Sequence, residues 1–220
     1  MKHSLYISIL ISTLSILTAC GGDSAGLAGA TYKITFNSSW SAITHPDNFP
    51  ASPHFSGLIG ATHNEHDVYW KENELATAGI EAMAETGSKV ILSTEINNKI
   101  ASGNSDVLIS EAGIGVSPGS VSFNLVLKAE FSRITLVSML APSPDWFVGV
   151  SGLNLLDNGE WLKSKTVKLY VYDAGTDDGT TYTAIDSDTN PKQTIQQIKS
   201  SPFLVDGKVT EIGEFIFEKQ

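Results

Sequence analysis

Three aspartates crowd one short, glycine-containing loop of the chain. The stretch VYDAGTDDGTT, residues 171–181, contains Asp173, Asp177 and Asp178. Carboxylates held ~4 Å apart repel by about 4 kcal/mol per pair at an effective dielectric constant of about 20. Such a loop is stable only if water surrounds the carboxylates or a cation neutralises them. Asp178-Gly179 is also a typical hairpin-turn signal, so the loop alone leaves both explanations open.

Another aspartate, distant in sequence, occupies a comparable position. Asp145 stands in PSPDWFVGV, directly before an apolar segment, and Asp173 directly follows another apolar segment. If the two segments are neighbouring strands, Asp145, Asp173 and Asp177 meet at one end of a sheet. Ca²⁺ takes about six to eight oxygen ligands from carboxylates, carbonyls and water, so the three aspartates form a candidate calcium site. Their spacing does not follow the EF-hand order.

Four histidines form a second group of candidate ligands. His45, His54, His63 and His66 lie in a segment that reads as loop. Imidazole binds zinc, but no H-E-x-x-H helix is present, so we expect these histidines to pack and hydrogen-bond. His63 or His66 would be the general base if the aspartates held a metal that activates water. No G-x-S-x-G elbow or phosphate-binding glycine loop is present, which favours a protein that is not an enzyme.

Composition and charge narrow the functional classes. The chain has 220 residues, of which 41% are hydrophobic, 17% are charged and 19 are glycine. These values are typical of a globular, β-rich protein. With 14 Lys and Arg against 24 Asp and Glu, the net charge is −10, which argues against a nucleic-acid partner. An acidic surface instead attracts cations.

The first residues have the features of a lipoprotein signal peptide. An apolar run over residues 5–17 is shorter than the about 20 residues that span a bilayer and is typical of a signal-peptide core. It leads into Leu-Thr-Ala-Cys20, which resembles the lipobox of bacterial lipoproteins, where the cysteine is lipidated. Cys20 is the only cysteine, so an intrachain disulfide is excluded. We expect a signal peptide at 1–19, a lipidated Cys20 with a flexible tether over 20–30, and attachment to a bacterial cell envelope, at the outer membrane or cell surface.

Residues 31–220 read as one domain of short apolar-alternating runs separated by turn signals. A helix is expected over 73–86, ended by Gly87, and a second begins at Asn190-Pro191. The four tryptophans are expected to pack in the core or under loops. The pattern predicts an all-β fold, an antiparallel β-sandwich of about eight strands with one or two short helices. The expected strands are 32–36, 90–94, 122–128, 133–139, 146–150, 167–171, 181–185 and 214–217.

Several uncommon motifs stand in one order along most of the chain. PSPDWFVGV and DAGTDDGTTY are preceded by HPDNFPASPHFSGLIGATH and LATAGIEAMAETG, and GEW lies between them. Over residues 31–198 this order resembles the spondin N-terminal domain, known from the F-spondin extracellular matrix proteins. The resemblance implies a β-sandwich similar to calcium-dependent lipid-binding domains. It also implies a Ca²⁺ held by Asp145, Asp173 and Asp177, and it leaves Asp178 to the turn.

Together these features predict a surface-tethered, calcium-binding spondin-domain lipoprotein. Its expected role is a non-enzymatic adhesion or ligand-binding module of the cell envelope, with a glycan, a matrix protein or a lipid headgroup as partner. Two alternatives stay open. The same carboxylates could serve a metal-dependent hydrolase, or the chain could be a purely structural envelope protein in which the acidic loop is only a turn.

Overall fold

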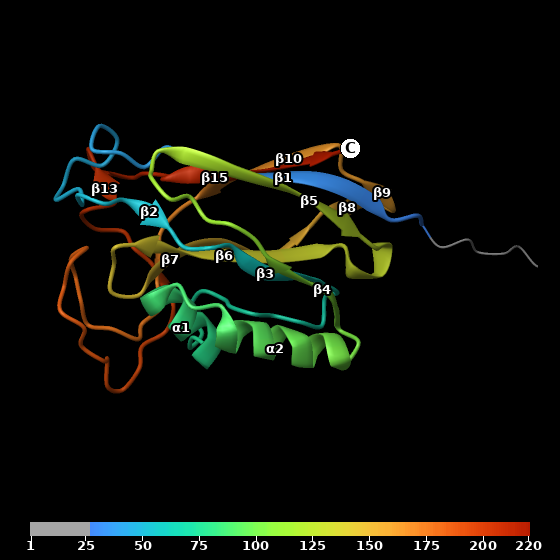
Figure 1. Ribbon diagram of the computed structural model, residues 1–220, viewed down its shortest axis with the longest axis horizontal. Coiled ribbons are helices and arrows are strands. Elements are labelled where there is room, and N and C mark those ends of the chain that lie inside the picture. The colour runs from blue at the N-terminus through green and yellow to red at the C-terminus, as the bar shows by residue number, and fades with distance from the viewer. Residues whose placement is uncertain (1–26) are drawn as a thin grey trace, which may run out of the picture.

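The computed structural model describes residues 27–220, which form three layers (Figure 1). A four-stranded sheet packs on a seven-stranded sheet, and two helices cover the outer face of the larger sheet. The predicted all-β sandwich with short helices is confirmed. Residues 1–19 and Cys20, which carry the predicted signal peptide and lipidation site, lie outside the described residues.

Two sheets and a few small elements make up the described chain. The first sheet has the strand order β10 (Ser164–Leu169), β15 (Gly213–Lys219), β1 (Ala30–Ser38) and β5 (Gly119–Leu127). The second runs β12 (Gln196–Gln197), β11 (Tyr172–Asp173), β7 (Trp146–Asn154), β6 (Arg133–Ala141), β3 (Ile59–His63) and β4 (Ser105–Ser110), with β2 (His54–Phe55) also paired to β6. The other elements are α1 (Ala78–Thr86), α2 (Val90–Ala101), the 3₁₀ turn η1 (Ala129–Phe131), and the strand pairs β8 (Leu156–Asp157) with β9 (Glu160–Trp161) and β13 (Leu204–Val205) with β14 (Lys208–Val209).

Strand β1 shows how sequence alternation builds the core. Tyr32, Ile34 and Phe36 are fully buried, while the residues between them face outward. The Phe36 ring packs on Phe55 and Phe215, with ring centroids 4.8 and 5.1 Å away. This core fills the space between the sheets, and a second core lies between the larger sheet and the helices.

Helix α1 is shorter than the sequence predicts at its start and ends where predicted. Thr77 caps it by accepting a hydrogen bond of 3.2 Å from the Ile80 amide. Gly87 ends it with a φ of 68°, a left-handed conformation that suits glycine. The residues before Thr77 do not join the helix, because Asn73 donates its amide to the Ile195 carbonyl at 2.9 Å.

The strand predicted over residues 90–94 is wrong, because this segment begins helix α2. Val90 and Ile91 favour strands by their intrinsic propensity, yet both are exposed, at 73% and 44%. The residues that the helix buries are Leu92 and Ile96, which stand four positions apart on one helical face. The burial of two apolar side chains at helical spacing therefore outweighs the strand propensity of the first two residues.

Two further predictions after the acidic loop are also wrong. Residues 181–185 form no strand, and the chain instead returns at Asp188, which bridges to Asp177. No helix follows Asn190-Pro191. The backbone there bonds to other segments, since the Gln193 amide donates to the Gly175 carbonyl at 2.8 Å.

The two ends of the sandwich differ in what they carry. Figure 1 shows the first described residues and the C-terminus at one end, and the β6–β7 turn and the loop after β11 at the other. The Trp161 indole donates to the Ala28 carbonyl at 2.8 Å, which fixes the start of the described chain. No helix among residues 27–220 is long and apolar enough to cross a membrane.

A substitution at Gly60 would test how closely β3 pairs with β6. A Cβ at this position would lie 1.9 Å from the Thr135 carbonyl oxygen, which is backbone and cannot rotate away. We expect Gly60→Ala to destabilise the protein by about 3 kcal/mol or more, since overpacking a core typically costs about 1–3 kcal/mol. Gly115→Ala is the matched control, because its Cβ would meet no atom within 4 Å. Urea unfolding measures both, and equal stabilities would contradict this account of the sheet.

Candidate metal centre

The structure brings the three predicted aspartates together at one end of the larger sheet. Asp145 immediately precedes β7, and β11 pairs with β7 so that Asp173 lies opposite Trp146. The Asp177 amide then donates to the Asp145 carboxylate at 3.2 Å. Neighbouring strands thus place carboxylates that are almost thirty positions apart in sequence beside one another.

Asp145 is the most enclosed of these acids. It is 0% exposed, and its Oδ2 accepts hydrogen bonds from the Thr176 amide at 2.8 Å and from the Thr176 hydroxyl at 3.3 Å, as well as from Asp177. Its Oδ1 is buried and has no hydrogen-bond partner among the described residues. Burial, and then the negative charge of Asp173, raise the pKa of Asp145 to about 6. A buried acceptor without a partner costs about 1–3 kcal/mol, so this oxygen lacks the polar partner that would offset its burial.

Gly175 sets the backbone that faces Asp145. Its φ is 73°, and a Cβ there would lie 2.4 Å from the Gln193 carbonyl oxygen, so only glycine fits. The Gly175 amide donates to Asp173 Oδ1 at 2.8 Å. The next two amides, of Thr176 and Asp177, then point at Asp145 Oδ2.

Asp177 and Asp178 have different environments although they are adjacent. Asp177 is 4% exposed and accepts from the Gly179 and Ser187 amides, each at 2.7 Å. Asp178 is exposed and accepts from the Thr189 hydroxyl at 2.8 Å. Asp178 thus stands apart from the buried acids, but it belongs to a wider loop closed at residues 187–189 rather than to a tight hairpin turn.

A fourth carboxylate that the sequence did not predict, Glu85 on α1, is near enough to Asp145 to be affected by its charge. Burial, followed by the negative charges of Glu81 and Asp145, raises its pKa, and a hydrogen bond with the Thr176 side chain opposes part of this shift. Its position was a usable signal. A negative charge in the last turn of a helix interacts unfavourably with the helix dipole. An acid at position 85 therefore indicates that contacts outside the helix favour it.

The cluster has an excess of negative charge. Burial, and then Asp177, raise the pKa of Asp173, while the Gly175 amide opposes the shift. Among the salt bridges of residues 27–220, none involves Asp145, Asp173, Asp177 or Glu85. These carboxylates are therefore near one another without a protein cation to compensate them.

The carboxylates supply oxygen atoms of the kind that a hard cation binds, but they do not form a metal-ligand group. Within the described part of the chain, no group of three or more His, Cys, Asp and Glu side chains is already arranged to hold a metal ion. Asp173 and Asp177 line a small cavity of about 170 Å³ together with Gly175 and Gln193. Ca²⁺ also accepts backbone carbonyls and water as ligands, so side chains alone need not complete a site.

The two histidines considered as a general base, His63 and His66, lie elsewhere. His54 pairs with Ala141 at the end of β6 that leads to Asp145, and its Nδ1 bonds to the Ser52 carbonyl at 2.8 Å. His63 is 1% exposed, and its ring nitrogens bond to Thr135 Oγ1 at 2.9 Å and the Asn64 carbonyl at 2.7 Å. It pairs with Arg133 at the start of β6, whereas Asp145 follows the end of that strand, about 25 Å away at about 3.3 Å per residue. His66 is exposed in the loop after β3. Neither imidazole can serve the carboxylate cluster as a base.

Fold and site together define a class, the antiparallel β-sandwich with an acidic cluster in the loops at one end. Within that class the chain belongs to the spondin N-terminal domain family, whose family model, Spondin_N, matches residues 30–205. The chain is 33% identical to human spondin-2 over 204 residues, which cover 88% of this chain and 61% of that protein. It is 31% identical to rat spondin-1 over 214 residues, which cover 90% of this chain and 26% of that protein. The chain thus spans less than two thirds of these relatives.

The raised pKa of Asp145 predicts a pH-dependent cost in the metal-free protein. The folded state keeps a proton up to about pH 6 that the unfolded state releases near its ordinary pKa of 3.8. Stability is therefore lost as the pH rises between these values, by on the order of 2–3 kcal/mol. Asp145→Asn keeps an oxygen for the Thr176 and Asp177 amides but cannot ionise, so it should escape this loss.

Urea unfolding in chelator, at about pH 4 and about pH 7.5, measures the effect. We expect Asp145→Asn to be more stable than the wild type at the higher pH and not at the lower. A difference between the two proteins that does not change with pH would contradict the assignment of Asp145 as a buried, uncompensated acid.

Proposed function

We propose that this protein is a calcium-binding, non-enzymatic ligand-recognition module of the bacterial cell envelope, anchored by a lipid on Cys20. One observation carries the calcium part of the proposal. Asp145 is fully buried beside Asp173, one of its oxygens has no partner, and no ion pair among residues 27–220 compensates the cluster. Carboxylate oxygens without a protein cation are the ligands that Ca²⁺ favours.

The residues of this chain have distinct roles in such a site. Asp145, Asp173 and Asp177 would hold the ion, whose chemistry there is charge neutralisation. Asp145 Oδ2 remains bonded to the Thr176 amide, which leaves Oδ1 for the cation. Asp177 keeps the returning segment in place through the Ser187 amide. Because Asp178 is exposed and bonded to Thr189, it would stay outside the site.

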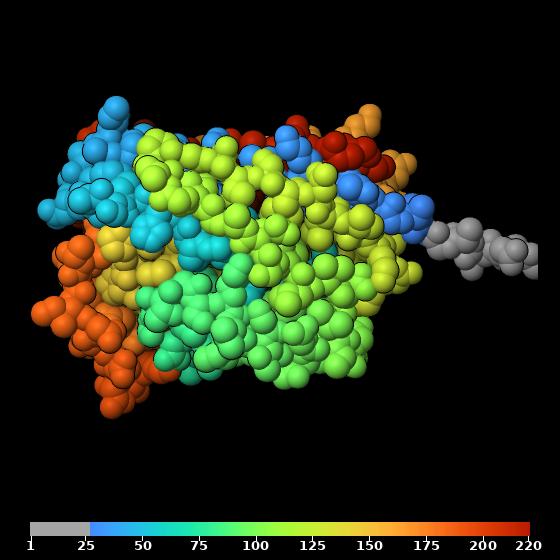
Figure 2. All heavy atoms as spheres, viewed as in Figure 1, coloured from blue at the N-terminus to red at the C-terminus, as the bar shows by residue number. Residues whose placement is uncertain are grey.

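The position of the cluster supports a role in binding outward-facing partners. The first described residues lie at one end of the sandwich, while the segment after β11, orange in the space-filling view, projects at the other (Figure 2). A lipid on Cys20 would attach the chain through its N-terminal side and leave the acidic loops directed away from the anchoring membrane. Durable anchoring is expected because several acyl chains bind far more tightly than one. The partner would be a glycan, a matrix protein or a lipid headgroup on a facing surface.

The two alternative functions have less support. A metal-dependent hydrolase needs a general base near the carboxylates, but His63 lies at the far end of β6. A purely structural envelope protein would have no use for a cation at the acidic loop. It predicts that calcium leaves both stability and protease sensitivity of the loop unchanged.

Calcium should stabilise the folded protein, because a ligand that binds only the folded state shifts the equilibrium by mass action. With a dissociation constant of about 10⁻⁴ to 10⁻³ M, about 10 mM Ca²⁺ should add roughly 1–3 kcal/mol. Asp173→Asn and Asp177→Asn should remove most of this gain by removing ligand charge. Thermal unfolding of each protein with calcium and with chelator measures the calcium-induced shift.

Asp178→Asn is the matched control for these two variants, since it removes the same charge from the same loop. It should keep most of the calcium-induced shift. Equal losses from all three substitutions would mean that the ligand assignment is wrong. A wild-type protein whose unfolding is identical in calcium and in chelator would refute the calcium site itself.

Lipidation is tested separately from calcium. When the full chain is expressed in a bacterium that processes lipoproteins, Cys20→Ser should move it from the membrane fraction to the soluble fraction. The same substitution should abolish incorporation of a labelled fatty acid, since residue 20 would supply the only thiol. Ser24→Ala is the control and should remain membrane-bound. Membrane attachment that persists in Cys20→Ser would exclude the proposed anchor.

A further inference from the structure

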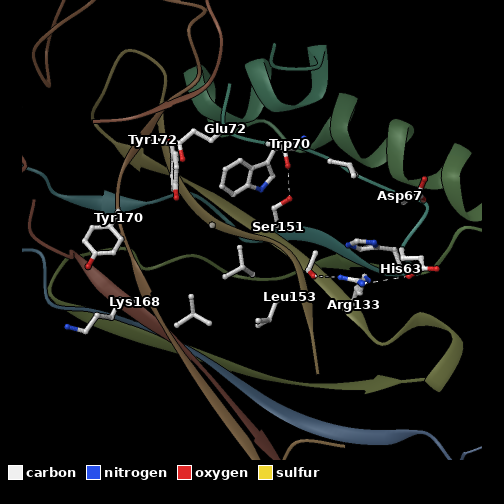
Figure 3. Close-up of a pocket in the computed structure, with 17 residues that line it drawn as sticks. His63, Asp67, Trp70, Glu72, Arg133, Ser151, Leu153, Lys168, Tyr170 and Tyr172 are labelled. Atoms are coloured by element: carbon white, nitrogen blue, oxygen red, sulfur yellow. Dashed lines mark hydrogen bonds and ion pairs between the residues drawn. The ribbon is translucent and has the colours of Figure 1, made fainter. Parts of the chain in front are cut away.

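A cavity of about 550 Å³ opens between the two sheets, and none of the clustered aspartates lines it (Figure 3). Its origin lies in the strand pairing. β11 pairs with β7 only at Trp146 and Phe147, so the rest of β7 has no strand on that side. The chain then passes from β10 in the first sheet to β11 in the second through Tyr170, which leaves a gap beside β7.

The walls of the cavity are mainly apolar and well fixed. Val150, Leu153 and Val167 line the cavity. Trp70 and Tyr172 form an aromatic wall (Figure 3). The two aromatic rings pack edge to face with centroids 4.9 Å apart. Main-chain contact also holds this wall, since the Ser151 hydroxyl donates to the Trp70 carbonyl at 2.6 Å. Such a preformed, apolar space suits a hydrocarbon or aromatic body.

One end of the cavity carries a cation that is only weakly compensated. Arg133 donates one hydrogen bond of 3.2 Å to the Gly152 carbonyl, and its nearest carboxylate, Glu65, is 3.9 Å away. Glu65 is 71% exposed, and an exposed ion pair of this kind contributes at most about 1 kcal/mol. Most N–H donors of the guanidinium are therefore free for an anionic group. The two lining lysines are already paired, Lys168 with Glu211 at 2.7 Å and Lys71 with Glu74 at 3.0 Å.

We propose that this cavity binds a small amphipathic anion. The apolar body of the ligand lies against Val150, Leu153 and Val167, and its carboxylate or sulfonate bonds to Arg133. The cavity volume lies within the about 300–1,000 Å³ typical of small-molecule sites. Glu65 competes with the ligand for the guanidinium and has to turn toward solvent, which its exposure permits.

Two fluorescent probes with the same rings separate the apolar and ionic parts of the site. 8-Anilinonaphthalene-1-sulfonate carries the anion, and N-phenyl-1-naphthylamine lacks it. Arg133→Gln should weaken binding of the sulfonate about tenfold, as expected for one charged hydrogen bond, and leave the neutral probe unaffected. Leu153→Trp fills the cavity and should weaken both probes at least about tenfold.

Matched variants complete the test. Glu65→Gln should tighten the sulfonate by about threefold and leave the neutral probe unchanged, and this holds even if Arg133→Gln fails to fold. Lys168→Gln should change neither probe, because Lys168 already has a partner. Thermal unfolding confirms that each variant is folded, since these probes also bind unfolded apolar surface. Unchanged sulfonate binding in Leu153→Trp, or equal effects of Arg133→Gln on both probes, would overturn the proposal.

Discussion

The buried carboxylate of Asp145 is the interaction on which this end of the molecule depends. One of its oxygens gathers the amides of Thr176 and Asp177, so the turn that follows β11 takes its shape from an acid on another strand. The other oxygen is left without a partner. This one desolvated carboxylate organises the loop through its hydrogen bonds. It also makes the loop electrostatically unfavourable, because the fold places Asp173 and Asp177 close to it.

The two-residue pairing of β11 with β7 has consequences at two sites. It places Asp173 opposite Trp146, and so beside Asp145. Since the pairing stops at Phe147, it also leaves the remainder of β7 open toward β10, and the cavity next to Tyr172 forms there. Adjacent residues of β11 therefore contribute to different features, with Tyr172 in an apolar cavity and Asp173 in a polar cluster. A longer β11 would extend the sheet and close the space between the sheets.

Sequence reasoning succeeded where one local pattern decides the structure. The alternation in β1 placed Tyr32, Ile34 and Phe36 in the core, and the strand ends brought Asp145 to Asp173. It failed where contacts distant in sequence decide. Burial of Leu92 made a helix from a segment with strand propensity, and the return of the acidic loop at Asp188 depends on hydrogen bonds that no local signal encodes. The cavity could not be predicted, because its residues, such as Trp70 and Arg133, come from segments that only the fold brings together.

The acidic loop can be explained as a turn or as a cation site. The two explanations apply to different atoms of the loop. Asp178 bonds to Thr189, and Asp177, although it would also be a ligand, accepts from the Gly179 and Ser187 amides, so the outer loop can close without a metal. Asp145 and Asp173 have raised pKa values and no basic partner, so the inner part is where a cation would lower the free energy. A bound ion would therefore change the charge of a loop that is already shaped. The ion would neutralise the acidic end of the sandwich and offer a partner a metal to coordinate. A partner could therefore recognise the change in charge more than any change in fold.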